Sequence, residues 1–250
     1  MNKMRSCFTA VLMLLSTIPL HAQTKKQQFH LYLLAGQSNM AGRGIVEPQD
    51  TIGNPRILSL NKEGNWVIAK DPVHFDKSAA GVGPGLSFAR EMIKRDPNII
   101  IGLIPCAAGG SGIDHWLYNN YWEQTKSYPW DNAIMRTELA MKEGTLKGIL
   151  WHQGESDSSP EKVKEYANKL VGLVNKFRKE FNLPNLPFIA GELPEFNQRR
   201  EALNAQLYEA GKRLSFYKVV SGKGLTPNAD NLHIDAASQR IFGKRYAEKL

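Results

Sequence analysis

An apolar run that stops abruptly at a glycine constrains this chain most. Residues 31–35 (Leu-Tyr-Leu-Leu-Ala) suit a strand that is buried on both faces of a sheet. The sequence then changes to Gly-Gln-Ser-Asn at residues 36–39. A serine that follows a buried strand lies at the carboxyl edge of the sheet, where open α/β folds bind ligands. Ser38 is therefore a candidate nucleophile, and an ordinary polar turn is the alternative interpretation.

The first 22 residues are predicted to be a cleaved secretory signal peptide. Lys3 and Arg5 give a positive start, residues 7–20 are mostly apolar, and Ala22 is a small residue before a cut. The apolar run is short for a membrane span. We therefore expect a secreted or periplasmic protein of residues 23–250 without stable membrane insertion after cleavage. A retained N-terminal anchor is the alternative.

The charge and the cysteine content of the mature chain indicate which partners and which covalent cross-links to expect. The formal net charge of +8 falls to +6 when Lys3 and Arg5 leave with the signal. The basic residues are scattered among acidic ones, so no nucleic-acid partner is expected. Cys106 is then the remaining cysteine and forms no internal disulfide. Stability must come from the core.

Apolar strands alternate with amphipathic helices along the rest of the chain, which indicates one α/β domain with a mostly parallel sheet covered on both faces. The polar segment 45–80 is expected to be a long loop with two short strands, of the kind that faces a substrate. Strands are expected at residues 31–35, 56–60, 66–69, 98–104, 147–152, 186–190 and 217–220, and helices at 81–94, 132–142, 160–181, 197–214 and 235–250.

Polar or glycine-rich segments follow four of the expected strands, at residues 36–44, 106–116, 153–157 and 191–194. In a parallel sheet these ends share one edge, so the segments can converge on one cleft. A further segment, Asp230-Asn-Leu-His233, precedes the last helix, and its spacing can bring the Asp230 carboxylate to Nδ1 of His233. These two residues are expected to supply the base and its orienter in a serine triad, in the chain order Ser, Asp, His.

Acyl transfer through serine also requires donors for the tetrahedral oxyanion. The candidates are the Ser38 amide, a backbone amide within Gly109–Gly110, and the side-chain amide of Gln153. A neutral NH₂ group such as that of Gln153 stabilises negative charge without titrating.

Together these motifs resemble those of the SGNH hydrolases, and more narrowly the branch of carbohydrate esterase family 6 (the acetylxylan esterase type) and the sialate O-acetylesterase-like proteins. The resemblance covers nearly the whole mature chain. It rests on residues 36–44, 105–110, 151–157 and 230–233, with support from 74–77 and 81–85.

The resemblance implies a role for each matched residue. Ser38 matches the nucleophile, His233 the base and Asp230 its orienter. Gly110 matches the glycine of the oxyanion hole, with Gly109 as the alternative, and Gln153 stands where many relatives have asparagine.

The same resemblance implies a three-layer α/β/α sandwich of the flavodoxin-like type and removal of O-acetyl groups from carbohydrates, often acetylated xylan, without metal or cofactor. It leaves two alternatives on the same scaffold, a sialate O-acetylesterase and a general short-chain esterase. A non-catalytic glycan-binding module is the alternative of another class.

Further side chains near these motifs are candidates for substrate contacts or for a metal site. Arg43 would steady the oxyanion loop, meet an acidic sugar or pair with a surface carboxylate, and Glu155 would orient a loop or supply a second carboxylate. His152, His115 and Cys106 lack zinc-ligand spacing, so no metal is predicted. His74 is expected in a loop or at the surface. The oligomeric state is left open. The expected substrate-binding residues are Gln37, Asn39, Arg43, Gly109, Trp116 and Glu155.

Overall fold

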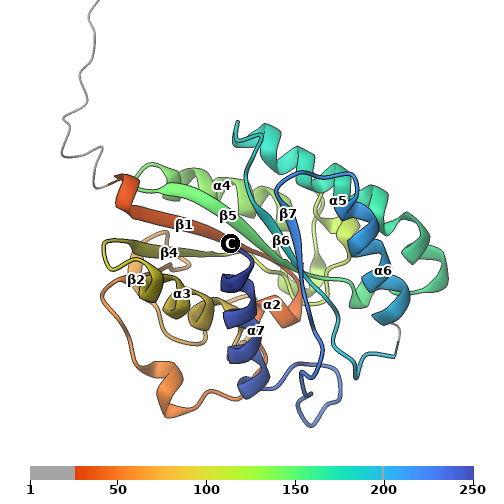
Figure 1. Ribbon diagram of the computed structural model, residues 1–250, viewed down its shortest axis with the longest axis horizontal. Coiled ribbons are helices and arrows are strands. Elements are labelled where there is room, and N and C mark those ends of the chain that lie inside the picture. Colours follow the sequence, from red (N-terminus) through yellow and green to blue (C-terminus); the bar gives the residue numbers. More distant parts are fainter. Residues whose placement is uncertain (1–25, 199) are drawn as a thin grey trace, which may run out of the picture.

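A seven-stranded sheet forms the middle layer of the protein (Figure 1). The computed structural model describes residues 26–198 and 200–250, and the predicted signal peptide lies outside the described residues. Neighbouring strands pair in parallel except β2 and β3, which pair antiparallel. The strand order is β3-β2-β4-β1-β5-β6-β7, with β1 (Phe29–Gly36), β2 (Ile57–Leu60), β3 (Trp66–Ile68), β4 (Ile100–Pro105), β5 (Thr145–His152), β6 (Phe188–Gly191) and β7 (Tyr217–Val220).

Helices cover both faces of this sheet. Helices α3 and α7 pack on one face and α4, α5 and α6 on the other (Figure 1). The bounds are α2 (Ser38–Ala41), α3 (Pro84–Arg95), α4 (Pro129–Met141), α5 (Pro160–Glu180), α6 (Arg200–Gly211) and α7 (Ala236–Glu248), with short 3₁₀ turns η1 (Pro48–Thr51), η2 (Ile113–His115), η3 (Glu123–Thr125) and η4 (Glu155–Asp157).

Strand β1 shows why its sequence is apolar throughout. Leu31, Leu33 and Ala35 belong to the core under α4, α5 and α6. Tyr32 and Leu34 belong to the second core under α3 and α7. Every residue of the strand except His30 is therefore buried, which confirms the predicted sheet covered on both faces.

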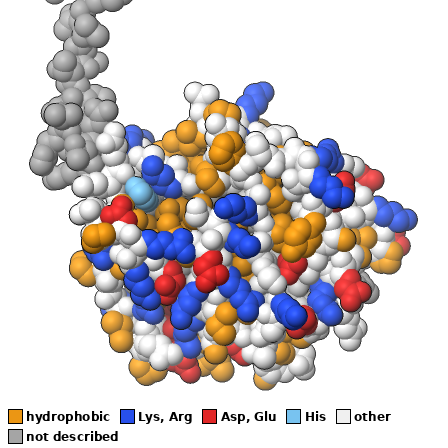
Figure 2. All heavy atoms as spheres, viewed as in Figure 1, with side chains coloured by type: hydrophobic (Ala, Val, Ile, Leu, Met, Phe, Trp, Pro, Cys, Tyr) orange, Lys and Arg blue, Asp and Glu red, His pale blue; other side chains and the backbone are white. Residues whose placement is uncertain are grey.

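The alternating elements predicted from the sequence are confirmed, with ends that differ by a few residues. The region after β1 differs: α2 begins at Ser38 itself, where the sequence suggested only a turn. Among the described residues, no helix combines the length and apolarity that crossing a bilayer would need. Figure 2 shows acidic and basic side chains mixed over the face that carries α3 and α7.

Helices α3 and α7 approach each other closely at a glycine. A Cβ atom on Gly243 would lie 2.1 Å from Ser87 Oγ and 2.3 Å from the carbonyl oxygen of Pro84. Asp235 caps α7 by accepting a hydrogen bond from the Ser238 amide at 2.7 Å. The interior of α7 at Gly243 thereby packs directly against the first turn of α3.

We expect Gly243→Ala to lower the free energy of unfolding by about 1–3 kcal/mol, because the methyl group would force α3 and α7 apart. The matched control is Gly172→Ala in α5, where an added Cβ meets no atom within 4 Å. That change should raise the free energy of unfolding by about 0.4–1 kcal/mol. Urea unfolding of both variants measures the difference, and equal shifts would contradict the close packing of α3 on α7.

Candidate active site

The end of β1 places Ser38 at the carboxyl edge of the sheet. Gly36 has φ +132°, and a Cβ atom there would lie 2.1 Å from the carbonyl oxygen of His152 at the end of β5. That same carbonyl accepts a hydrogen bond from the Gln37 amide at 2.9 Å. A glycine is therefore required for the chain to leave β1 beside β5 and begin α2 at Ser38.

The three residues predicted to form a triad come together in the structure. Ser38 Oγ lies 3.0 Å from His233 Nε2, although the two residues are 195 positions apart in the chain. His233 Nδ1 lies 2.6 Å from Asp230 Oδ2. This geometry fits an imidazole that donates its Nδ1 proton to Asp230 and accepts the Ser38 proton at Nε2.

Asp230 is held as a carboxylate by its own loop. Its Oδ1 accepts hydrogen bonds from the amides of Leu232 and His233, each at 2.9 Å. Partial burial favours the neutral carboxyl, but these amides and the His233 ring outweigh it and lower the pKa of Asp230 to about 2. The group that orients His233 is therefore charged throughout the neutral pH range.

Asn39 connects the nucleophile turn to the histidine loop. Its Oδ1 accepts a hydrogen bond from the Ile234 amide at 2.9 Å, and its Nδ2 donates to Glu155 Oε1 at 2.6 Å. Its carbonyl oxygen accepts a hydrogen bond from Gln239 Nε2 in α7 at 2.9 Å. The Asn39 side chain is 1% exposed, so the structure corrects its assignment as a substrate contact. Asn39 instead holds the turn that carries Ser38 against the loop that carries His233.

The glycine doublet presents one amide that has no acceptor. The Gly109 amide donates to Asp76 Oδ2 at 2.9 Å. Within the described residues, the amides of Gly110 and Ser38 donate no hydrogen bond, and both residues line the pocket around the triad. Gly110 and Ser38 are thus the backbone donors that remain available to an oxyanion.

Gln153 does not reach the pocket, contrary to its expected place in the oxyanion hole. Its side chain is fully buried, and its Nε2 lies 2.6 Å from Asp157 Oδ2, 3.1 Å from Gln37 Oε1 and 3.3 Å from the Ser111 carbonyl oxygen. The Tyr166 hydroxyl donates to its Oε1 at 2.9 Å. These contacts use the donors of the amide inside the protein.

Gln37, and not Gln153, brings a side-chain amide to the pocket. Its side chain lines the pocket, and its Oε1 faces Gln153 Nε2. Gln37 Nε2 has no hydrogen-bond partner among the described residues. Because the oxygen end is held from within, the NH₂ end is left available to the pocket. Its position next to the nucleophile was the only signal in the sequence.

Arg43 and Asp76 form a buried ion pair beside the oxyanion loop. Arg43 Nη2 lies 2.7 Å from Asp76 Oδ2, with the two side chains 8% and 4% exposed. Arg43 Nη1 also donates to the Gly42 carbonyl oxygen at 2.6 Å. The pair ties the turn after Ser38 to the Gly109 amide. Sequence reasoning missed Asp76, which was noted only as part of a motif.

Two further predictions are corrected by burial. Trp116 is fully buried, packs edge-on against Trp151 at 5.0 Å between ring centroids, and donates to Ser111 Oγ. It therefore belongs to the core and offers no face to a sugar. His74, expected in a loop or at the surface, is 4% exposed, and its burial lowers its pKa to about 4.

The hollow around the triad has a volume of about 620 Å³ and is open to solvent. The residues expected to contact substrate that line this hollow include Glu155, Arg43 and Gly109. No group of three or more His, Cys, Asp or Glu side chains among the described residues could hold a metal ion. The lining residues are Gln37, Ser38, Arg43, Lys77, Ala79, Gly109, Gly110, Gln124, Glu155, Ser156, Asp230, Leu232 and His233.

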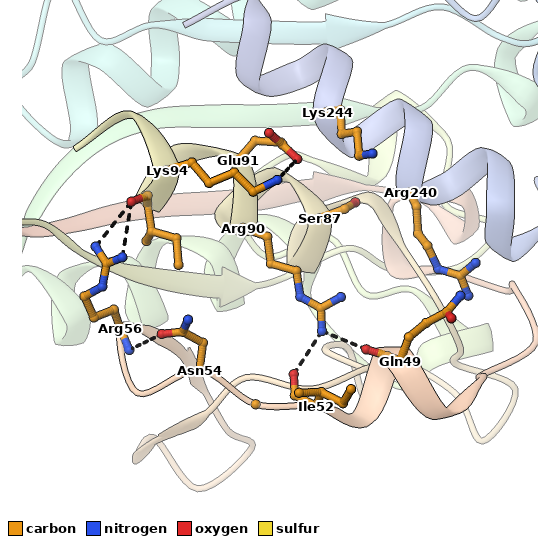
Figure 3. Close-up of a pocket in the computed structure, with 12 residues that line it drawn as sticks. Gln49, Ile52, Asn54, Arg56, Ser87, Arg90, Glu91, Lys94, Arg240 and Lys244 are labelled. Carbon is orange, nitrogen blue, oxygen red and sulfur yellow. Dashed lines mark hydrogen bonds and ion pairs between the residues drawn. The ribbon is translucent and has the colours of Figure 1, made fainter. Parts of the chain in front are cut away.

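A hollow of similar size, about 640 Å³, lies over α3 and α7 (Figure 3). Arg90 donates there to the carbonyl oxygens of Gln49 and Ile52, each at 2.9 Å, and Lys94 pairs with Glu91 at 2.7 Å. The side chains that line this hollow hold the backbone of the neighbouring loop, and none of them is an activated nucleophile. Chemistry, and not volume, therefore identifies the hollow at Ser38 as the candidate active site.

Comparisons with known proteins show which proteins this chain is similar to. The family model described as carbohydrate esterase, sialic acid-specific acetylesterase matches residues 28–250. A probable carbohydrate esterase of Arabidopsis thaliana, At4g34215, is 33% identical over 243 residues, which cover 87% of this chain and 88% of that protein. Its X-ray structure superposes with a TM-score of 0.79 at 31% identity, covering 88% of this chain and 96% of that one.

More distant structures share the fold. NanS matches with a TM-score of 0.70 at 18% identity over 90% of this chain and 97% of its own. A carbohydrate acetylesterase of Xanthomonas citri, XAC1771, matches with a TM-score of 0.68 at 18% identity over 88% of this chain and 55% of its own. The seven-stranded α/β architecture is that of the SGNH-like hydrolase fold of NanS and related esterases.

The low pKa of Asp230 makes a prediction about stability in acid. Because its pKa is about 2 in the folded protein and ordinarily 3.8, the carboxylate stabilises the fold above about pH 4, and this contribution is lost as the pH falls toward 2. Asp230→Asn should therefore lose stability less steeply over this range, as measured by urea unfolding. The control Glu209→Gln removes a solvent-exposed pair with Lys212 and should keep the wild-type slope. Parallel curves for wild type and Asp230→Asn would contradict the assignment.

Proposed function

The chain belongs to the carbohydrate esterase family of sialic acid-specific acetylesterases, and on that premise we propose that it is a serine esterase that removes O-acetyl groups from carbohydrates through an acetyl-serine intermediate. The observation that supports this proposal most strongly is the continuous contact from Asp230 through His233 to Ser38 at the wall of an open pocket. A serine hydroxyl needs such an adjacent base to act at neutral pH.

The first half of the reaction transfers the acetyl group to the enzyme. His233 Nε2 takes the proton of Ser38 Oγ as that oxygen attacks the acetyl carbonyl carbon. The tetrahedral oxyanion is stabilised by the amides of Ser38 and Gly110 and by Nε2 of Gln37. Removing one such donor costs about 2.7–4 kcal/mol of transition-state stabilisation in comparable sites. The bond to the sugar oxygen then breaks, and His233 gives its proton to that oxygen.

The second half regenerates the enzyme. His233 takes a proton from a water molecule, whose oxygen attacks the acetyl carbon, and the proton returns to Ser38 Oγ as acetate leaves. Asp230 remains ionised and stabilises the imidazolium that forms in each half. Three side chains and their supporting amides thus complete the cycle without a metal or cofactor.

Two classes of acetylated carbohydrate are candidate substrates. We propose acetylated xylan or a related polysaccharide or oligosaccharide as the substrate, following the resemblance to acetylxylan esterases of carbohydrate esterase family 6. The family description favours acetylated sialic acid as a second candidate. Secretion or periplasmic location, proposed from the apolar N-terminal segment, would place the enzyme with such extracellular glycans.

Ser38→Ala should lower acetate release from acetylated glycans by roughly a thousandfold or more, because no other group can form the acetyl intermediate. Ser221→Ala, on an exposed loop, is the control and should keep wild-type activity. A fluorophosphonate probe should label the wild type and the control but not the Ser38 variant. Undiminished acetate release by Ser38→Ala would refute the proposal, and an unlabelled wild type would favour a glycan-binding module.

A further inference from the structure

Arg136, in α4, is a buried cation without a carboxylate partner. Its residue is 8% exposed, and none of the ion pairs among the described residues includes it. Its Nη2 donates to the carbonyl oxygens of Leu60 and Asn61 at 2.6 and 3.0 Å, and its Cζ lies 4.8 Å from the centroid of the Phe75 ring. Its Nε is buried and has no hydrogen-bond partner. A buried guanidinium with unused donors is costly and requires an explanation.

Arg178 shows how this chain satisfies a buried arginine that has only a structural role. It is 7% exposed and also lacks a carboxylate partner among the described residues. Its Nε donates to the Leu186 carbonyl oxygen, and its Nη2 donates to those of Leu186, Ser215 and Phe216. Arg136 differs in two respects, because its Nε is unpaired and because it lines a hollow.

The hollow that Arg136 lines, called here the Arg136 hollow, has a volume of about 430 Å³. It adjoins the candidate active site, since Asp76 and Ala108 line the Arg136 hollow while the next residues in the chain, Lys77 and Gly109, line the pocket at Ser38. The two hollows therefore share a wall. The residue pairs 76–77 and 108–109 therefore each contribute to both hollows, one residue to each.

The lining of the Arg136 hollow favours a negatively charged ligand. Lys62 and Lys126 add to the charge of Arg136. Asp76 also lines the hollow, but its carboxylate already pairs with Arg43 and accepts the Gly109 amide. His74 is neutral at pH 7 because burial lowers its pKa to about 4. The charge of Arg136 is therefore left uncompensated inside the hollow.

Apolar surface at the same place suits a sugar ring. Phe75 and Met135 line the Arg136 hollow and are 41% and 61% exposed. Pyranose rings pack well on such faces, and the volume lies in the range of small-molecule sites. A planar guanidinium also matches the two oxygens of a carboxylate.

We propose that the Arg136 hollow is a subsite for a carboxylate-bearing sugar residue that neighbours the acetylated residue in the substrate. This inference rests on the proposed esterase function and adds a substrate class to it. The acetyl group would react at Ser38 while the Arg136 guanidinium binds the carboxylate of the neighbouring sugar. A substrate without that carboxylate would lose this contact but keep the reacting group.

The test compares acetylated xylo-oligosaccharides that carry a glucuronic acid branch with acetylated xylo-oligosaccharides that carry none. The wild type should have a lower KM for the acidic substrate. Arg136→Met should raise that KM by roughly ten- to a hundredfold, the range expected for a lost charged hydrogen bond, and should leave the KM for the neutral substrate unchanged. Arg178→Met is the matched control for loss of a buried arginine, and should not change the ratio of the two KM values.

A second variant distinguishes an effect of charge on KM from an effect of impaired folding. Asn132 lines the same hollow, and Asn132→Asp adds a negative charge there at nearly constant volume while Arg136 keeps its contacts. It should raise the KM for the acidic substrate and not for the neutral one. Because the two substrates share their acetyl group, kcat should change little for either.

Three results would overturn the subsite. They are equal KM values for the two substrates with the wild type, equal shifts in both KM values with Arg136→Met or Asn132→Asp, and competitive inhibition by inorganic phosphate as strong as that by glucuronic acid, which would indicate a site for any small anion. Failure of the esterase function itself is distinguishable, because acetate would then be released from neither substrate and Ser38 would not react with the fluorophosphonate.

Discussion

The contact between Ser38 Oγ and His233 Nε2 is the interaction on which the candidate active site depends. It joins the end of the first strand to the loop before the last helix, and neither element can form it alone. Gly36 brings the serine turn against β5, and Gly243 lets α7 pack against α3. Asn39 then links the two segments through the Ile234 amide and Gln239. The geometry of the candidate active site is thus a product of close backbone packing in the fold.

The sequence predicted the fold and the pairing of Asp230 with His233 because both leave local signals. Strands that are buried on both faces have continuous apolar sequences. In β1, successive side chains point alternately into the two cores. The short spacing of Asp230 and His233 within one loop also anticipated their hydrogen bond. Where a function depends on residues near each other in the chain, or on a repeating pattern, the sequence is informative.

Long-range orientation was not predictable in the same way. Gln37 and Gln153 have the same side chain, and only the buried acceptors around Gln153 and the Tyr166 hydroxyl decide which amide stays inside. Trp116 follows the glycine loop but faces the core, because aromatic neighbours surround it there. The interpretations of Asp76 and Arg136 likewise depend on partners far away in the sequence, or on the absence of a carboxylate partner for Arg136 among the described residues.

A crystal structure of the protein after reaction with a fluorophosphonate tests the central claim most directly, because the tetrahedral phosphonyl group resembles the oxyanion intermediate. The account predicts phosphorus bonded to Ser38 Oγ, with a phosphonyl oxygen within hydrogen-bond distance of the Ser38 amide, the Gly110 amide and Gln37 Nε2, and His233 still bound to Asp230. Phosphorus on another residue would contradict it. So would a phosphonyl oxygen bound by Gln153 while Gln37 is turned away.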